Sequence, residues 1–226
     1  MKISLIIPVY NESGTISACL DNLKCLRGEA EILFADGGST DDTVAQIGGR
    51  YPVVTCPKGR AKQMNTAAAA AAGDVLLFSH CDSVLPADTF EEISEAVGNG
   101  AAFGCFHIGF DYDGPFMRCN AWISNELRTR LAHIAFGDQG MFFRRELFSR
   151  VGGFSDLPIM EDYALSKRLK RERVPLYILS GRIITSGRRY RTGCPLMVMW
   201  RMFVLRCDYR LGVDPQKIAR RYQDIR

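Results

Sequence analysis

The hydrophobic pattern of the first hundred residues alternates between two kinds of segment. Short continuous apolar runs, typical of strands buried on both faces, occupy 3–9, 31–35, 53–54 and 75–79. Segments with helical apolar spacing or few helix breakers lie between and after them, at 12–26, 41–47, 61–72 and 86–97. This alternation predicts an α/β fold with a mostly parallel central sheet flanked by helices.

The pattern changes near Gly98. Strands are predicted at 101–110, 140–143 and 176–179, and helices at 116–131, from 145 and at 161–171. Two more helices, 194–211 and 215–224, are interrupted by Gly212 and Pro215. We therefore divide the chain into residues 1–100, residues 101–190 of the same domain, and a C-terminal helical segment, 191–226.

Composition agrees with one folded domain. The chain has 226 residues, 47% of them hydrophobic and 24% charged, which excludes a disordered chain and a fibrous one. The net charge of +4 is too small to indicate a nucleic-acid-binding protein.

The cysteine pattern and the apolar runs indicate in which cellular compartment the protein works. The eight cysteines form no CxxC pair, so we interpret them as core thiols in a reducing compartment and expect a cytoplasmic protein. The first apolar run is too short for a signal peptide. The longest, 194–205, contains Arg201 and is shorter than the roughly 20 residues of a membrane-spanning helix.

Polar residues follow three of the predicted strands. Tyr10-Asn11-Glu12 follows the first, Asp36 the second, and His80-Cys81-Asp82 the fourth. Ligands of open parallel sheets bind at this edge, where a carboxylate can accept a hydrogen bond from a base or sugar, or ligate a hard cation. Capping of the following helices is an equally open role for Asp36 and Asp82. No glycine-rich dinucleotide-binding motif follows the first strand, and no P-loop is present.

An ordered set of segments carries a family resemblance. The segments are SLIIPVYNE (4–12), ADGGSTDDT (35–43), GDVLLFSHCD (73–82), GDQGMFFRR (137–145), and GF (153–154) followed by MED (160–162). Together they resemble the inverting glycosyltransferases of family 2, which have a nucleotide-sugar-binding GT-A fold. Residues 59–65, His80 and residues 186–190 resemble a small bacterial subgroup of that family.

The resemblance implies which residues bind a nucleoside-diphosphate sugar of the UDP or GDP type. They are Pro8, Tyr10, Glu12, Asp36, Arg60, His80, Asp138, Gln139, Arg188 and Arg189. Asp36 would bond the base edge, and the planar fork of Arg60 would steady the base or the pyrophosphate. The basic cluster that includes Arg188 and Arg189 would clamp the diphosphate, although a solvated basic loop is an equal alternative.

The resemblance also assigns a metal ligand and a general base. Asp82 would hold Mn²⁺ or Mg²⁺ against the diphosphate, which stabilises the departing charge. The usual Asp-x-Asp is His80-Cys81-Asp82 here, so His80 is open as a ligand, a phosphate partner or a buried structural residue. Asp162 would take the proton of the acceptor hydroxyl, with Glu161 in support. The alternative is that both only favour the helix dipole.

The sequence thus predicts metal-assisted transfer of a sugar, with inversion, to an unidentified hydroxyl acceptor, for which a lipid-linked alcohol is one option. Residues 1–100 would bind the donor and 101–190 the acceptor. A nucleotidyltransferase, or a noncatalytic nucleotide-sugar-binding or membrane-docking module, is the alternative. The segment 194–211, with Arg201, Arg206 and Arg210 among apolar residues, is either an interfacial helix whose arginines reach lipid headgroups or a helix packed on the core or a second subunit.

Overall fold

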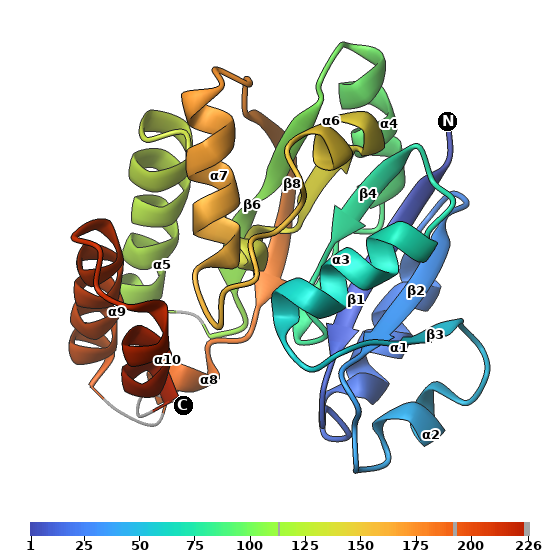
Figure 1. The fold of residues 1–226 in the computed structure, drawn as a ribbon, viewed down its shortest axis with the longest axis horizontal. Coiled ribbons are helices and arrows are strands. Elements are labelled where there is room, and N and C mark those ends of the chain that lie inside the picture. The colour runs from blue at the N-terminus through green and yellow to red at the C-terminus, as the bar shows by residue number, and fades with distance from the viewer. Residues whose placement is uncertain (113, 192–193, 224–226) are drawn as a thin grey trace.

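A computed structural model describes residues 1–112, 114–191 and 194–223, and its strands form an eight-stranded sheet (Figure 1). The strands are β1 (Ile3–Val9), β2 (Glu31–Asp36), β3 (Val53–Thr55), β4 (Val75–Phe78), β5 (Ser83–Val84), β6 (Phe103–Phe110), β7 (Met141–Arg144) and β8 (Tyr177–Thr185). Their spatial order is β3-β2-β1-β4-β7-β6-β8-β5. Pairing is parallel from β3 to β4 and between β6 and β8, while β7 runs antiparallel to both neighbours.

Helices cover both faces of this sheet (Figure 1). They are α1 (Ile16–Cys25), α2 (Thr43–Ile47), α3 (Arg60–Ala70), α4 (Thr89–Gly98), α5 (Pro115–Trp122), α6 (Arg145–Arg150), α7 (Glu161–Arg171), α8 (Arg188–Arg191), α9 (Pro195–Arg210) and α10 (Pro215–Gln223). The predicted α/β architecture is therefore confirmed, and one sheet joins the two parts divided near Gly98.

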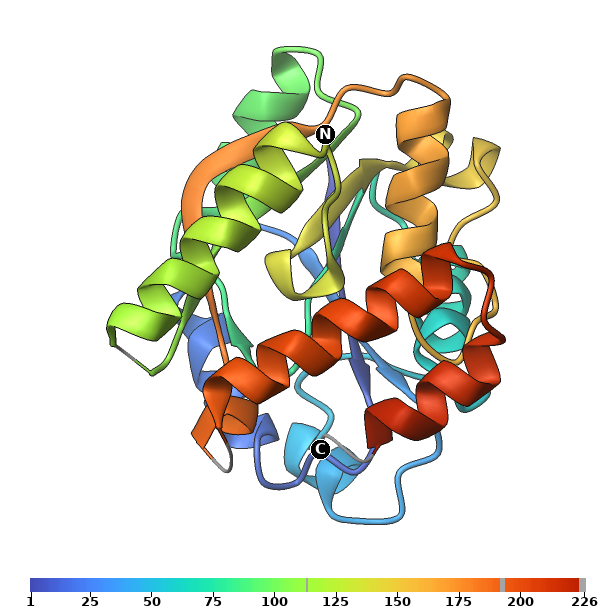
Figure 2. The ribbon, with the colours of Figure 1, turned by 90° about the vertical axis from the view of Figure 1, so that its left-hand side faces the viewer.

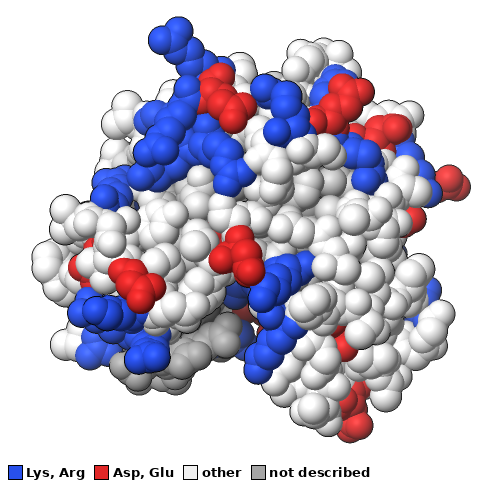
Figure 3. Space-filling model, viewed as in Figure 1, with Lys and Arg blue, Asp and Glu red and all other residues white. Residues whose placement is uncertain are grey.

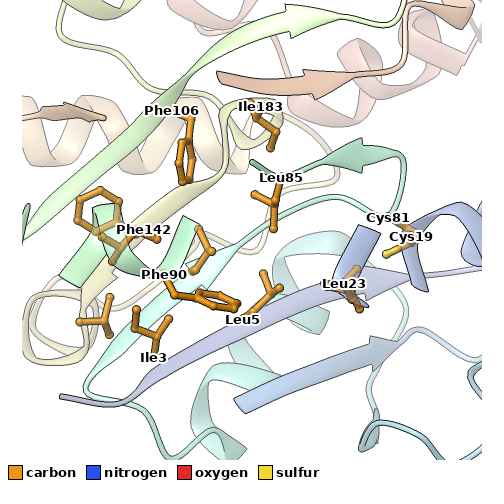
Figure 4. Packing of buried hydrophobic residues seen from close by; sticks show 14 of the residues in the cluster. Ile3, Leu5, Cys19, Leu23, Cys81, Leu85, Phe90, Phe106, Phe142 and Ile183 are labelled. Carbon is orange, nitrogen blue, oxygen red and sulfur yellow. The ribbon is translucent and has the colours of Figure 1, made fainter. Parts of the chain in front are cut away.

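Side-chain alternation along β1 shows how the sheet builds two cores. Leu5 and Ile7 join a cluster with α1 and α4, whereas Ile6 joins a second cluster with α3 and α7. Figure 4 shows Leu5 beside Phe90 of α4 within the first cluster. Because both faces are buried, the strand has no polar face, and this explains its continuous apolar sequence.

The structure differs from the predicted elements at several places along the chain. The helix expected at 116–131 is α5 followed by a π-helical segment, Ile123–Leu131, where Asn125 pairs with the backbone of Ile108 in β6. The strand expected at 176–179 continues to Thr185 because it pairs with β6 along its length. The short β5 was not predicted, and it pairs with the end of β8. Tertiary pairing, rather than local pattern, decides these bounds.

The C-terminal helices form a third layer on one side of the molecule. Leu205 of α9 and Ile218 of α10 pack with Ile134, Met160 and Tyr163 in a separate apolar cluster. Figure 2 shows α9 running across the face turned to the viewer, with α5 on the same face. Among the described residues, none of the helices combines the length and apolar character that crossing a membrane requires.

Candidate active site

The strand register brings the polar segments to one edge of the sheet. Val9 of β1 pairs with Asp36 of β2, and Ile6 pairs with Phe78, the last residue of β4. The chain therefore leaves all three parallel strands on the same side. The sequence-based prediction that residues 10–12, 36 and 79–82 share an edge agrees with this register.

The loop that contains Asp36 is closed by its own hydrogen bonds. Asp36 is only 6% exposed, and its carboxylate accepts the N–H groups of Gly38 and Ser39 and the Ser39 hydroxyl at 2.6–3.2 Å. Ser39 in turn accepts the Asn11 N–H at 3.0 Å. Asp36 thus shapes its own loop. It does not cap α2, so the helix-capping role considered for this residue is excluded.

The first loop is held in a similar way. The Glu12 carboxylate accepts the Thr15 hydroxyl at 2.6 Å, and its N–H donates to Thr43. Tyr10 is exposed beside Lys58, whose ammonium lies 2.9 Å from the phenol oxygen. Pro8 is half-buried at the end of β1. Of these side chains, Tyr10 is the one most open to a ligand from solvent.

A small cavity lies beyond the end of β4. Its polar lining comes from His80 and Ser79 after that strand, and from Glu161 and Asp162 at the start of α7. Phe78 and Phe154 form part of the apolar wall, with ring centroids 5.0 Å apart. His80 and Asp162, 82 positions apart in the sequence, therefore line the same cavity.

Gly137 marks the tightest approach in this cavity. A Cβ atom on it would lie 2.9 Å from His80 Nε2 and 3.3 Å from Asp162 Oδ2. Its N–H donates to Asp162 Oδ2 at 2.7 Å. The missing side chain is what allows the imidazole, the backbone and the carboxylate to converge.

Asp162 is fixed by backbone donors on both oxygens. Besides Gly137, the N–H of Tyr163 donates to Oδ1 at 2.6 Å. Each carboxylate oxygen has a second lone pair, so further acceptance of a hydroxyl proton remains available. A carboxylate with fixed orientation beside a cavity has the geometry required of a general base.

Glu161 has a different environment. It is 2% exposed, and Arg60 NH1 lies 3.4 Å from its Oε1. The pKa of Glu161 is raised, mainly by burial. The charge of Arg60 lowers it, and the nearby Asp162 carboxylate raises it. The pKa of Arg60 is raised too: burial opposes this, but Glu161, Tyr222, Asp162 and Asp82 outweigh it. Arg60 is therefore electrostatically coupled to the carboxylates on both sides of the site.

Asp82 faces the end of β8. Ser83 pairs with Thr185 across β5 and β8, and this pairing places Arg188 NH2 3.4 Å from Asp82 Oδ2. Gly187, before that arginine, donates its N–H to Asp111 at 2.6 Å. One predicted diphosphate-clamp residue thus meets the predicted metal ligand. The side chains of Arg189 and Arg191 lie outside the described residues.

The donor set suits a hard cation only in part. In the described residues, no group of three His, Cys, Asp or Glu side chains converges on one point. Asp82 nevertheless offers a half-buried carboxylate, 24% exposed, two residues from His80. Mg²⁺ and similar cations take one or two carboxylates and complete their shells with phosphate oxygens and water. The chain therefore fits a cation shared with a phosphorylated substrate.

Asp138 and Gln139 occupy a short 3₁₀ turn, Gly137–Gln139, before β7. Gln139 is fully buried, and its amide binds the Phe136 N–H and the Thr129 hydroxyl. It holds the turn in place and does not face the cleft, contrary to the expectation of a donor contact. Asp138 lies near Arg128 and Arg206, whose charges interact with it.

Two further residues were not singled out from the sequence. Gln63 in α3 donates to the carbonyls of Val9 and Ala35, at 2.8 Å each, and so joins the helix to two strand ends. Asn65 of the same helix pairs with the backbone of Phe154. The half-buried Arg128 of the π-helical segment lies over the Phe136 ring, its guanidinium carbon 4.6 Å from the ring centroid. Neither Gln63 nor Arg128 stands in a pattern that distinguishes it from a surface residue.

A sequence model described as glycosyl transferase family 2 matches residues 4–152. Among curated proteins, the chain is 27% identical over 169 residues to a PGL/p-HBAD biosynthesis glycosyltransferase of Mycobacterium bovis, covering 67% of this chain and 62% of that protein. It is 29% identical over 131 residues to a dolichol-phosphate mannosyltransferase of Pyrococcus furiosus, covering 52% and 37%. The chain thus spans less than two thirds of the length of these relatives.

Solved structures share the fold. S. aureus TarS 1–349 with UDP-GlcNAc superposes with a TM-score of 0.65 at 17% identity, covering 83% of this chain and 59% of that one. The Pyrobaculum calidifontis mannosyltransferase PcManGT with GDP-Man and Mn²⁺ gives 0.64 at 21% identity, covering 90% and 61%. Glucosyl-3-phosphoglycerate synthase of Mycobacterium tuberculosis with Mn²⁺, UDP and phosphoglyceric acid gives 0.64 at 20%, covering 94% and 79%.

Proposed function

This chain belongs to glycosyl transferase family 2, and we propose that it transfers a sugar from a nucleoside diphosphate to a hydroxyl acceptor, with inversion. The observation that supports this most is the convergence of Asp162, Glu161 and His80 on one cavity at the carboxyl edge of the sheet. Arg60 connects this cluster electrostatically to Asp82. A nucleotide-sugar pocket and a base for the acceptor need to be neighbours in this way.

Residues 1–100 are proposed to bind the donor. Tyr10, half-buried Pro8 and the Asp36 loop lie at adjacent strand ends, so a base and ribose would lie across them. The carboxylates of Glu12 and Asp36 accept hydrogen bonds within their own loops, so we assign these residues the role of shaping the pocket. The similar structures that contain UDP-GlcNAc or GDP-Man support a UDP or GDP donor.

Asp82 would hold a divalent cation together with the diphosphate, with His80 near the phosphate. The complexes of similar structures with Mn²⁺ support a divalent cation, and Mn²⁺ and Mg²⁺ are both candidates. When bound, such a cation stabilises negative charge on the departing diphosphate. Arg188 pairs with Asp82 at 3.4 Å, within reach of the same phosphates.

Asp162 is proposed as the general base. An acceptor hydroxyl in the cavity would give its proton to a carboxylate oxygen of Asp162. The hydroxyl oxygen would form the new bond to the anomeric carbon, opposite the breaking bond to the diphosphate. The backbone N–H groups of Gly137 and Tyr163 keep the carboxylate oriented during this transfer. Glu161 supports it by holding Arg60 in the site.

Residues 101–190 are proposed to shape the acceptor site. The PGL/p-HBAD biosynthesis and dolichol-phosphate relatives make a lipid-linked or hydrophobic acceptor the first candidate to assay. We place the protein in the cytoplasm, because the described cysteines are all free thiols.

A thermal-shift screen tests the donor half of the proposal. UDP, GDP and their sugars are added with and without Mn²⁺, since a ligand of the folded state raises the melting temperature. We expect one nucleotide series to raise it, and more so with Mn²⁺. The hit is then assayed for release of the nucleoside diphosphate with lipid-linked and soluble alcohols. Binding without any turnover would favour the noncatalytic alternative, and release of pyrophosphate would favour a nucleotidyltransferase.

A further inference from the structure

The outward face of α9 is apolar. Its exposed large side chains are Leu196, Met197, Trp200 and Phe203, which are 49–66% exposed. They recur every three or four residues and so share one face of the helix. On the inward side, Leu205 packs in the cluster with Tyr163 and Ile218. A helix face that is apolar is expected to be buried, and this outward face of α9 is exposed.

These side chains form a patch. The rings of Trp200 and Phe203 lie 5.7 Å apart between centroids. Beyond the end of the helix, Leu211 is 83% exposed. Single exposed apolar residues are ordinary on protein surfaces, whereas a contiguous group marks an interaction surface.

The positive charge of the chain is concentrated in the C-terminal segment that contains α9. Residues 188–226 hold ten Lys and Arg against three Asp, a net charge of +7, whereas residues 1–187 hold 19 against 22. Arg201 is exposed next to Trp200. Arg206 is half-buried, and burial lowers its pKa to about 10, with Arg128 adding to the effect. Arg201 is therefore the more accessible of these two arginines for the interfacial interpretation of 194–211.

A basic groove adjoins the C-terminal end of α9. Tyr209 and Gly212 line one side of it, and Lys167 and Arg171 of α7 line the other. Figure 3 shows Lys and Arg side chains gathered over α7. Positive charge at one end of a helix that has an exposed apolar face suits a lipid surface, where cations bind the headgroup phosphates and apolar side chains enter the acyl chains.

We propose that the outer face of α9 docks onto an anionic phospholipid membrane. The helix would lie in the plane of the interface, with Trp200 and Phe203 among the upper acyl chains and Arg201 at the phosphates. Tryptophan suits this depth because its ring is apolar and its N–H is polar. A protein partner would satisfy the apolar face but gives no reason for the concentrated positive charge. This docking does not depend on sugar transfer, so the two proposals fail separately.

Co-sedimentation with vesicles tests the docking. We expect the full chain to bind vesicles of phosphatidylcholine mixed with phosphatidylglycerol, and to bind phosphatidylcholine alone much more weakly. Trp200→Ser with Phe203→Ser should lower the partition coefficient more than tenfold, since both large apolar side chains are lost. Tyr177→Ser, at an exposed aromatic position at the start of β8, is the matched control and should leave binding unchanged.

Charge and fluorescence give two independent readouts. Arg201→Glu should weaken binding to anionic vesicles by fivefold or more, and added salt should do the same. Lys24→Glu, an exposed reversal on α1, should have little effect. The chain has two tryptophans, so Trp122→Phe leaves Trp200 as the sole indole, and anionic vesicles should shift its emission to shorter wavelength.

Two results would overturn the proposal. One is equal sedimentation of the parent and the Trp200→Ser, Phe203→Ser variant with anionic vesicles. The other is self-association of the parent without lipid that the same variant abolishes, because the face would then be covered by a second copy. Variants with unchanged melting temperatures are compared, so that loss of binding is not loss of folding.

Discussion

The loop around Asp36 and the cavity beside Asp162 differ in how fully their polar side chains are paired. In the loop, Asp36 receives several donors, and Asp41 accepts the Thr43 hydroxyl, which lowers the pKa of Asp41. In the cavity, burial raises the pKa of Glu161, and the buried Ser79 hydroxyl has no hydrogen-bond partner among the residues that the structure describes. Satisfied groups fix a shape, whereas under-satisfied ones are available to a substrate.

Replacement of Asp162 by Asn should have the largest effect. The amide cannot take a proton from the acceptor, so kcat should fall by between about 10² and 10⁴-fold while donor affinity stays within about twofold. Steady-state kinetics and calorimetry measure the two quantities. Asp156→Asn, at a surface carboxylate paired with Lys62, is the control. Full turnover by Asp162→Asn would remove Asp162 from the role of base.

Replacement of Asp36 by Ala should mainly reduce stability. The Gly38 and Ser39 donors would lose a charged acceptor, at a cost of about 1.5–3 kcal/mol in the free energy of unfolding. Denaturant titration measures it. Asp162→Asn should cost less stability than Asp36→Ala, because the amide oxygen of Asn can still accept one of the two backbone N–H groups that Asp162 accepts. Equal destabilisation by both would erase the distinction between the two regions.

Replacement of Gly137 by Ala should disturb the cluster by steric contact. The new Cβ would lie 2.9 Å from His80 Nε2, which costs at least about 1 kcal/mol in stability and displaces the imidazole. Gly98→Ala at the end of α4 is the matched control, since its Cβ meets no atom within 4 Å. If both variants melt at the parent's temperature, the crowding inferred here is absent.

Replacement of Glu161 by Gln should change the pH dependence of stability. A carboxyl group whose pKa is raised in the folded protein keeps its proton to a higher pH there than in the unfolded protein. Its contribution to stability is therefore complete below the ordinary pKa of 4.5 and is lost as pH rises through the raised value. The variant should lack this decline. A parent whose stability relative to the variant rises over that window would contradict the sign.

The sequence predicted the part of the fold that local pattern determines. The apolar runs of β1, β2 and β4 are buried on both faces, so they stand out without any tertiary information. β5 is two residues long, and the second half of β8 has polar and exposed positions, so their pairing depends on partners far away in the chain. The same limit explains why the exposed side of α9 could not be separated from its packed side.

For the candidate site, the order of the motifs predicted which segments take part. It did not predict which side chains contact one another. The approach of Asp162 to His80 depends on Gly137, which no local pattern marks as a contact point. Gln139 was predicted to contact the donor because it follows Asp138 in the motif. Its amide instead forms hydrogen bonds with the Phe136 N–H and the Thr129 hydroxyl. The pairing of Arg188 with Asp82 follows from β5 and β8. Side-chain direction is thus set by packing that the sequence does not display.

The most direct test of the central claim separates donor binding from proton removal in one experiment. The nucleoside-diphosphate sugar found by the screen is titrated calorimetrically into Asp82→Ala and Asp162→Asn, each with Mn²⁺ and with chelator. The account predicts that Asp82→Ala loses the Mn²⁺-dependent part of the affinity, and that Asp162→Asn keeps it. Full affinity in Asp82→Ala together with lost affinity in Asp162→Asn would contradict the assignment of both carboxylates.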